Sequence, residues 1–413
     1  MSMRNNPHEG ATRHEVERVS MLLLAMAALV VVTTPFDDAV RLHIPFLRNP
    51  SAVFGVALLC LYLFFSRGRI VLFSASHLWA ITFLALSSVQ EATRLLIADA
   101  SGSTFTGTPS ISVVFFLYMA WVQPIVLLLI VSMIAKGRKS AGVVLYGLPI
   151  VMGVLVIGGI PTAGFARWAP VGLNENFAGL SFGASIVIAT HWLMNTPLRG
   201  KYTGHAIYAV SLLLSVFGLL MSASRGASAA TLVAVCVLAV LTPVRSKNML
   251  YVGVAMFAFV LGFGPYLSSA SDVLVGRWSQ TLEGQSFGSR DTLFVISSDV
   301  LAERPTWGHG VQANFAVGER WWGQPGRPFS PHSTILALLV TFGVVGSLPW
   351  FCMYASICFT AWRHRHRVGG VMLLSLLALF SVYMITGNIS TNKLLYVTLG
   401  LAACLPTWAR QSN

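Results

Sequence analysis

A histidine and several arginines stand where they could move a proton and bind a phosphate group. His332 follows Ser330 and Pro331, a pattern typical of a helix N-terminus. The positive end of the helix dipole disfavours imidazolium there, so we expect a neutral ring near pH 7 that can take a proton from a hydroxyl group. A capping or interfacial histidine is the alternative interpretation.

Two arginines are the main candidates for binding an anion. Arg225 lies in the turn between Ser224 and Gly226, and Arg290 opens a predicted helix. The dipole repels a positive charge at that helix start, which favours a functional role for Arg290. Guanidinium groups make bidentate contacts with phosphate and can hold a pyrophosphate without Mg²⁺. The alternatives are snorkelling of Arg225 to lipid headgroups and a salt bridge between Arg290 and Asp291.

Membrane helices must position these side chains, because the composition is that of a membrane protein. Of 413 residues, 55% are hydrophobic and 10% are charged, and the mean hydropathy is +0.72, whereas a soluble domain carries roughly 25% charged residues. We predict an all-α polytopic membrane protein with about twelve transmembrane helices, from apolar runs near the roughly 20 residues that cross a bilayer. The spans are predicted near residues 19–34, 51–65, 70–88, 111–135, 141–159, 177–194, 203–223, 226–242, 248–266, 344–362, 369–387 and 394–408.

The distribution of charge orients these spans. With both termini in the cytoplasm, sixteen of the 27 basic residues and three of the 14 acidic residues fall in inner segments, so the whole net charge of +13 lies on one side. This asymmetry is the positive-inside pattern of membrane proteins, and it argues against nucleic acid as a partner. The first apolar run lacks a convincing cleavage site and is interpreted as an uncleaved signal anchor.

One long segment, residues 267–343, separates the ninth and tenth spans and is predicted to be a periplasmic loop. Its many aromatic residues argue against a disordered linker. Two short helices are expected in it, one from Arg290 to before Pro305 and one from Ser330 through Leu339, leading to Gly343 and the tenth span. The predicted parts are a cytoplasmic tail over 1–18, transmembrane helices 1–9 over 19–266, the periplasmic loop over 267–343, transmembrane helices 10–12 over 344–408 and a cytoplasmic C-terminus over 409–413.

Features that the sequence lacks argue against several classes of function. All 14 carboxylates fall outside the predicted spans, which argues against a proton-coupled transporter. There is no Walker motif, so we expect no nucleotide, and the cysteines and histidines show no metal-ligand spacing, so we expect no metal and no cofactor.

Five short motifs in order resemble the bacterial O-antigen ligase and polymerase superfamily, over roughly residues 170–350. These enzymes are membrane glycosyltransferases that use polyprenyl-pyrophosphate-linked glycans. The single large outer loop resembles that of the ligase branch. Ser333 differs from the asparagine that often follows the loop histidine in this superfamily. The motifs are Asn174-Glu175-Asn176-Phe177-Ala178, Ser224-Arg225-Gly226, Ser289-Arg290, Pro305-Thr306-Trp307-Gly308-His309-Gly310, and Pro331-His332-Ser333 through Gly343-Val344-Val345-Gly346.

The resemblance implies transfer of preassembled O-antigen polysaccharide from undecaprenyl pyrophosphate to lipid A–core oligosaccharide, at the periplasmic face of the inner membrane. It implies His332 as general base, with Arg225 and Arg290 binding the departing pyrophosphate in an inverting displacement. Weaker candidate site residues are Asn176, Arg277, Arg327 and His309.

Two alternatives stay open. An O-antigen polymerase would use the same lipid-linked donor but would extend it. A non-enzymatic polysaccharide or lipid exporter would need polar residues through several spans, and the predicted spans are uniformly apolar.

Overall fold

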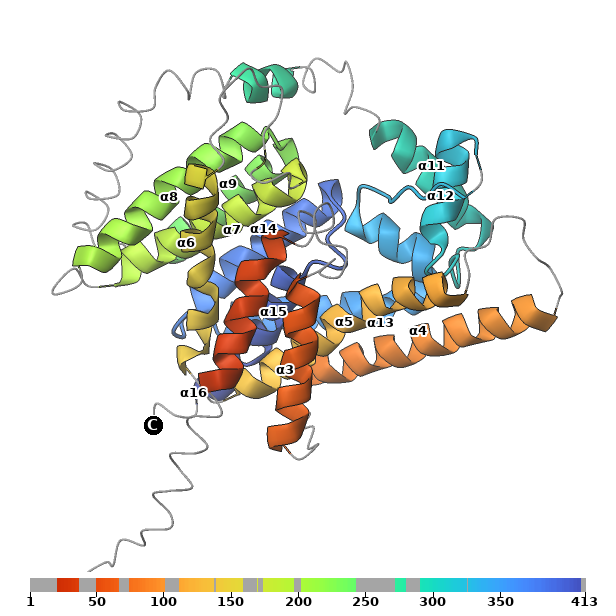
Figure 1. The fold of residues 1–413 in the computed structure, drawn as a ribbon, viewed down its shortest axis with the longest axis horizontal. Helices are drawn as coiled ribbons and strands as arrows, with labels where there is room; N and C mark the ends of the chain where they lie inside the picture. The colour runs from red at the N-terminus through yellow and green to blue at the C-terminus, as the bar shows by residue number, and fades with distance from the viewer. Residues whose placement is uncertain are drawn as a thin grey trace, which may run out of the picture.

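Every regular element that the computed structural model describes is a helix (Figure 1). The described residues are 21–36, 50–66, 74–100, 111–136, 139–158, 169, 174–196, 202–242, 272–279, 290–324 and 326–409. The α-helices are Met21–Thr33, α3 Pro50–Ser66, α4 Ala75–Ala100, α5 Ile111–Ala135, α6 Gly147–Gly158, α7 Glu175–Asn195, α8 Tyr202–Ser222, α9 Arg225–Leu241, 272–279, α11 Arg290–Glu303, α12 Ala313–Trp322, α13 Thr334–Arg363, α14 Gly370–Thr386, α15 Lys393–Ala403 and α16 Leu405–Ala409, with 3₁₀ turns η1 Thr34–Phe36 and η3 Lys139–Leu145.

The chain is a polytopic membrane protein. Within the described ranges, five helical stretches are long and apolar enough to cross a bilayer, and shorter apolar helices accompany them. Helices lie at eleven of the twelve predicted positions. The predicted ninth span, 248–266, lies outside the described residues, so the number twelve stays a prediction. The long stretches are Leu117–Ala135, Ala141–Gly158, Glu175–Asn195, Tyr202–Ser222 and Thr334–Arg363.

Helix α7 forms the centre of one half of the bundle. Of its apolar window, 83% is buried, and it packs against α8, α9 and α14. Small residues permit this close approach: Gly183 lies against Thr231 of α9, and Gly218 of α8 lies against the ring of Phe182. A second group of contacts joins α13 to α4 and α15 to α5. The N-terminal ends of α7 and α9 lie against the C-terminal end of α14, which in turn contacts the start of α13.

Helix α13 is broken at Gly343, at the predicted boundary between the loop and the tenth span. Gly343 has φ 68° and ψ −175°, a conformation that is essentially restricted to glycine. Residues 305–310 fill the break and supply the hydrogen bonds that the helix loses there. The N–H groups of His309 and Gly310 donate to the carbonyls of Val340 (2.7 Å) and Thr341 (2.7 Å), and those of Val344 and Val345 donate to Pro305 (2.9 Å) and Thr306 (3.1 Å).

The described part of the long loop forms a small helical unit on the first half of α13. Helix α11 begins at Arg290, as predicted, and packs on α13, whereas α12 was not predicted. The unit lies at the right of Figure 1, above α13, and has its own apolar core of Leu293, Val300, Ala313, Val317 and Val340. This packing fixes where the N-terminus of α11 lies relative to α13.

Candidate active site

His332 and Arg290 line one cavity of about 230 Å³. The cavity lies between the N-terminal half of α11, the residues that lead into α13 and the C-terminal end of α14. Part of the His332 side chain is exposed and Arg290 is half-buried, so both can meet a ligand that enters the cavity. The remaining lining residues are Asp291, Leu293, Phe294, Ser297, Ser333, Leu336, Ile385 and Thr386.

The segment that carries His332 is held by the end of α14. The Thr334 N–H and hydroxyl both donate to the Gly387 carbonyl, at 3.1 Å and 2.8 Å. The Ser333 hydroxyl donates to the Met384 carbonyl at 3.2 Å. Two consecutive residues are thus anchored directly after His332, which restricts where its ring can lie.

The predicted start of this helix at Ser330 and Pro331 is wrong. The helix begins at Thr334, and Ser333 is its N-cap, with φ −137° and ψ 132° and a side chain that accepts from the Leu336 N–H at 3.5 Å. Ser330 instead accepts a hydrogen bond from the Asn388 amide at 2.8 Å. Contacts with the chain after α14 therefore hold the preceding residues outside the helix, and His332 lies one residue before the cap. Ser333 has a structural role as the N-cap, a position at which serine and asparagine are both favoured.

The surroundings of His332 favour its neutral form. Its ring lies edge-on to Phe329, with centroids 5.7 Å apart. Burial lowers the pKa of His332 below the ordinary value for histidine, and the positive charge of Arg290 lowers it further. The sequence predicted a neutral ring from the helix dipole, whereas the structure supports a neutral ring through partial burial and the charge of Arg290. A neutral imidazole can accept a proton from a hydroxyl group.

Arg225 and Arg277 link the turn before α9 to residues 272–279. Arg225 donates to the Arg277 carbonyl at 2.9 Å, and Arg277 donates to the Ala223 carbonyl at 2.6 Å. The predicted tight turn is present: Ala223 has φ 45°, and Ser224 caps α9 by accepting from the Ala227 N–H. This exchange fixes residues 272–279 to the turn, and it gives the weaker candidate Arg277 a structural contact.

The Arg225 turn adjoins the cavity but Arg225 does not line it. Gly226 packs directly against Thr386, a lining residue, and a side chain at position 226 would collide with it. Asn176 joins the same region, because its side-chain oxygen accepts from Ser224 at 3.3 Å and its carbonyl accepts from Tyr383 at 3.0 Å. The structure therefore brings Asn176 and Arg225 to the α14 wall of the cavity.

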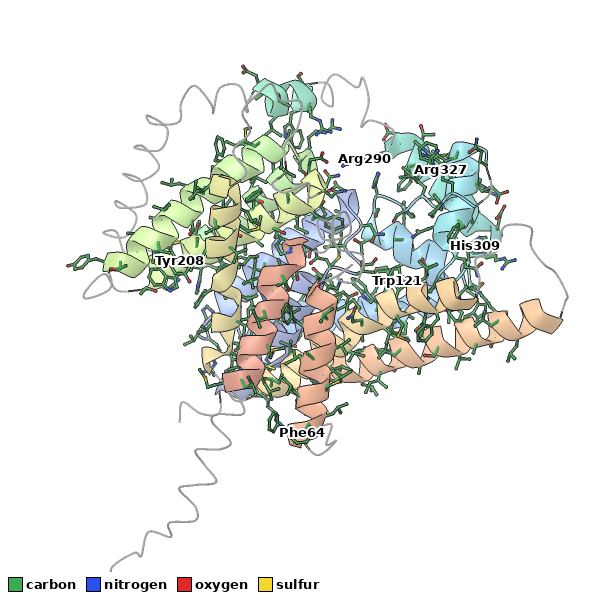
Figure 2. All side chains as sticks on the ribbon, viewed as in Figure 1. Phe64, Trp121, Tyr208, Arg290, His309 and Arg327 are labelled. Atoms are coloured by element: carbon green, nitrogen blue, oxygen red, sulfur yellow. The ribbon has the colours of Figure 1, made fainter. Side chains whose placement is uncertain are left out.

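The other weaker candidates lie elsewhere on the loop unit (Figure 2). The guanidinium of Arg327 stacks 3.8 Å from the ring centroid of Trp322, and Trp322 meets Phe329 edge-on. His309 bonds the Val300 carbonyl through Nε2 at 2.7 Å, and burial lowers its pKa. Neither residue lines the cavity. Each instead makes a contact within the loop unit, so the structure gives both a structural role.

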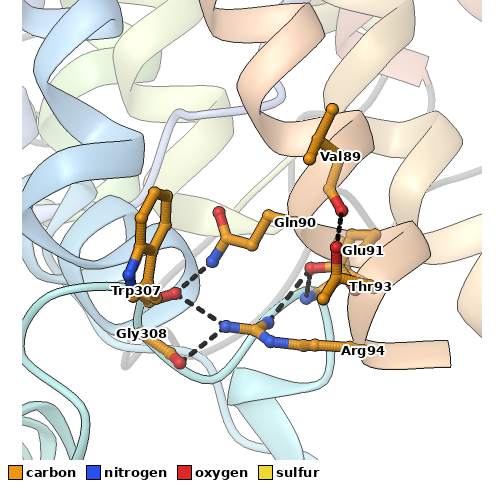
Figure 3. A network of polar contacts seen from close by, with 8 residues as sticks. Val89, Gln90, Glu91, Thr93, Arg94, Trp307 and Gly308 are labelled. Atoms are coloured by element: carbon orange, nitrogen blue, oxygen red, sulfur yellow. Dashed lines mark hydrogen bonds and ion pairs between the residues drawn. The ribbon is translucent and has the colours of Figure 1, made fainter. Parts of the chain in front are cut away.

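The structure contains a polar cluster on α4 that the sequence did not lead us to predict. Helix α4 continues past the predicted span to Ala100, and its side chains bind the backbone of residues 307–311 (Figure 3). Arg94 donates to the carbonyls of Trp307 and Gly308, both at 2.6 Å, and forms an ion pair with Glu91 at 3.2 Å. Glu91 also accepts from the Val311 N–H at 3.0 Å. The spacing of Glu91 and Arg94, three residues apart, was the available signal.

Among the described residues, no three His, Cys, Asp or Glu side chains gather as metal ligands would. A family model described as O-antigen ligase matches residues 210–351, which include His332, Arg290 and Arg225. No curated protein matches the chain.

Proposed function

Because residues 210–351 place the chain in the O-antigen ligase and polymerase family, we propose that it is an O-antigen ligase. It transfers preassembled O-antigen polysaccharide from undecaprenyl pyrophosphate to a sugar hydroxyl of lipid A–core oligosaccharide, in lipopolysaccharide biosynthesis. The observation that carries the proposal is the shared cavity of His332 and Arg290, next to the turn of Arg225.

His332 acts as the general base. Its lowered pKa leaves the imidazole free to take the proton of the acceptor hydroxyl near pH 7. The acceptor oxygen then attacks the anomeric carbon of the donor, and the bond from that carbon to the pyrophosphate oxygen breaks. Attack from the face opposite the leaving group inverts the configuration. The proton remains on His332 until solvent removes it.

Arg290 and Arg225 bind the pyrophosphate and stabilise the charge that develops on it as it leaves. Electrostatic stabilisation of this kind is often the largest contribution to catalysis. Arg290 lies in the cavity with His332 and lowers its pKa, so the two side chains are close enough to interact. Arg225 does not line the cavity, but its turn packs on Thr386, and the proposal assigns it a contact with the pyrophosphate from there. Two guanidiniums can neutralise a pyrophosphate without a metal ion.

The cavity faces the periplasm in this proposal, and both termini lie in the cytoplasm. The loop of residues 267–343 is then periplasmic, between helices 1–9 over 19–266 and helices 10–12 over 344–408. The basic residues support this orientation, because their excess falls entirely in the segments assigned to the cytoplasm.

Reconstitution of the purified chain in lipid tests the proposal. Lipid-linked O-antigen donor and rough lipopolysaccharide are expected to give ligated product, with the same yield when chelator is added. Donor alone should stay unchanged in length. Lengthening of the donor would identify a polymerase, and loss of activity with chelator would refute the metal-independent account.

A further inference from the structure

Three aromatic side chains of the loop unit, Trp321, Trp322 and Phe329, form an aromatic cluster that contacts His332. The rings of Trp321 and Phe329 stack with centroids 5.0 Å apart, and the ring of Trp322 meets Phe329 edge-on at 5.5 Å. Phe329 in turn meets the His332 ring at 5.7 Å. None of the three lines the cavity that His332 shares with Arg290. The aromatic cluster therefore contacts the proposed base outside the proposed donor site.

The outer part of the aromatic cluster is accessible to a ligand. Trp321 and Phe329 are half-buried and pack against the core of the loop unit. Trp322 ends α12 and keeps an exposed fraction of 37%. An exposed tryptophan alone needs no explanation, but this one is joined through Phe329 to the exposed His332. Its accessible surface and the proposed base thus belong to one continuous set of side chains.

Arg327 adds a positive charge beside the exposed ring. Its guanidinium lies 3.8 Å from the centroid of the Trp322 ring, and its side chain is exposed. In the described part of the loop unit, the ion pairs join Glu303 to Arg320 and to His309 and do not include Arg327. A guanidinium has five N–H donors, and an aromatic ring satisfies none of the directional ones fully. Arg327 can therefore donate to the oxygen atoms of a ligand that lies against Trp322.

We infer that Trp322 and Arg327 bind an anionic sugar of the acceptor oligosaccharide, an inference that rests on the proposed function. The C–H face of a sugar ring can pack on the apolar surface of a tryptophan, whose ring also attracts cations and polarised hydrogens. The phosphate or carboxylate of such a sugar matches the fork of donors on arginine. Two ring contacts lead from Trp322 through Phe329 to His332, so the bound sugar lies near the hydroxyl group that His332 deprotonates.

The direction of attack favours the acceptor over the donor as the occupant of this surface. In the proposed reaction the pyrophosphate lies in the cavity with Arg290, and the acceptor oxygen must approach the anomeric carbon from the opposite side. The aromatic cluster contacts His332 but does not line that cavity. An acceptor held on the cluster can therefore present its hydroxyl group to His332 while the donor occupies the cavity.

Binding of two lipids to the full-length chain in nanodiscs tests the inference. The probes are rough lipopolysaccharide and undecaprenyl pyrophosphate bearing a sugar. Trp322→Leu and Arg327→Gln are each expected to weaken binding of rough lipopolysaccharide by about 3- to 10-fold and to leave binding of the second lipid unchanged. High salt should reduce the loss in Arg327→Gln, because salt screens the charge that the variant lacks. Trp322→Phe, which keeps an aromatic ring, should give a smaller loss than Trp322→Leu.

Two matched controls come from the same loop unit. Trp307 is also exposed, at 50%, but is not part of the aromatic cluster, and Arg320 pairs with Glu303. Trp307→Leu and Arg320→Gln should bind both lipids as the wild type does. The inference is overturned if Trp322→Leu and Arg327→Gln bind rough lipopolysaccharide normally, or no more weakly than the controls. Equal weakening of both lipids would also overturn it, because the surface would then contact membrane lipid in general.

The transfer reaction separates this inference from the proposed function. In a functioning ligase, the two variants should raise KM for rough lipopolysaccharide and leave kcat and the KM for donor unchanged, a pattern that a merely structural role would not give. Ligation by both variants with the wild-type KM for acceptor would leave the ligase standing and overturn the inference. A wild type that binds rough lipopolysaccharide through Trp322 and Arg327 but makes no product would refute the ligase and leave the sugar-binding surface standing.

Discussion

Replacing Arg290 by glutamine is expected to change both the rate of transfer and its dependence on pH. Arg290 shares the cavity with His332, and its positive charge is the second cause of the lowered histidine pKa, after burial. Glutamine keeps a side chain of similar length that can form hydrogen bonds but removes the charge. The variant therefore separates charge from packing.

The rate at high pH should fall by roughly 10²- to 10³-fold, the usual effect of removing one group that stabilises charge in a transition state. The acid side of the profile should shift as well. In the wild type the rate rises with pH as His332 loses its proton, with a midpoint below the ordinary value of 6.5 because the pKa is lowered. Without the guanidinium one cause of the lowering is gone, so the midpoint moves upward.

The assay is kcat/KM for ligation in proteoliposomes, measured across pH 4.5–8.5 with saturating acceptor. Arg320→Gln is the matched control, because Arg320 lies on α12 and pairs with Glu303 outside the cavity; its rate and midpoint should stay as in the wild type. A variant at Arg290 that loses rate with an unchanged or lower midpoint would refute the electrostatic link to His332. An unchanged rate would remove Arg290 from the site.

Three further substitutions test other parts of the structure. His332→Gln should lower turnover by roughly 10²- to 10⁴-fold and abolish the acid limb, with unchanged thermal unfolding; wild-type turnover would exclude it as the base. Gly343→Ala should destabilise the chain by at least about 1–3 kcal/mol, because of its positive φ and a collision with the Thr306 backbone, seen as a lower unfolding temperature in detergent. Arg94→Met should destabilise the attachment of the loop to α4 by about 3–5 kcal/mol, because it removes the ion-pair partner of the buried Glu91, and limited proteolysis should then cut the loop faster than in the wild type.

The sequence alone located most of the helices and several of their ends. Apolar runs near bilayer length had to become helices, because lipid offers no hydrogen-bond partner to an open backbone. The same local reasoning identified the turn at Arg225, the start of α11 at Arg290 and the boundary at Gly343. It also selected His332 and Arg290 as candidates from their residue types and neighbours.

Only the tertiary structure decided how these parts meet. The start of α13 lies at Thr334 because Gly387 and Met384 of the α14 end bind the residues beside it, and local capping preference could not reveal that contact. His332 and Arg290 share a cavity because α11 packs on α13. Propensity and hydropathy act on neighbours along the chain, whereas a cavity depends on contacts between segments that are distant in sequence.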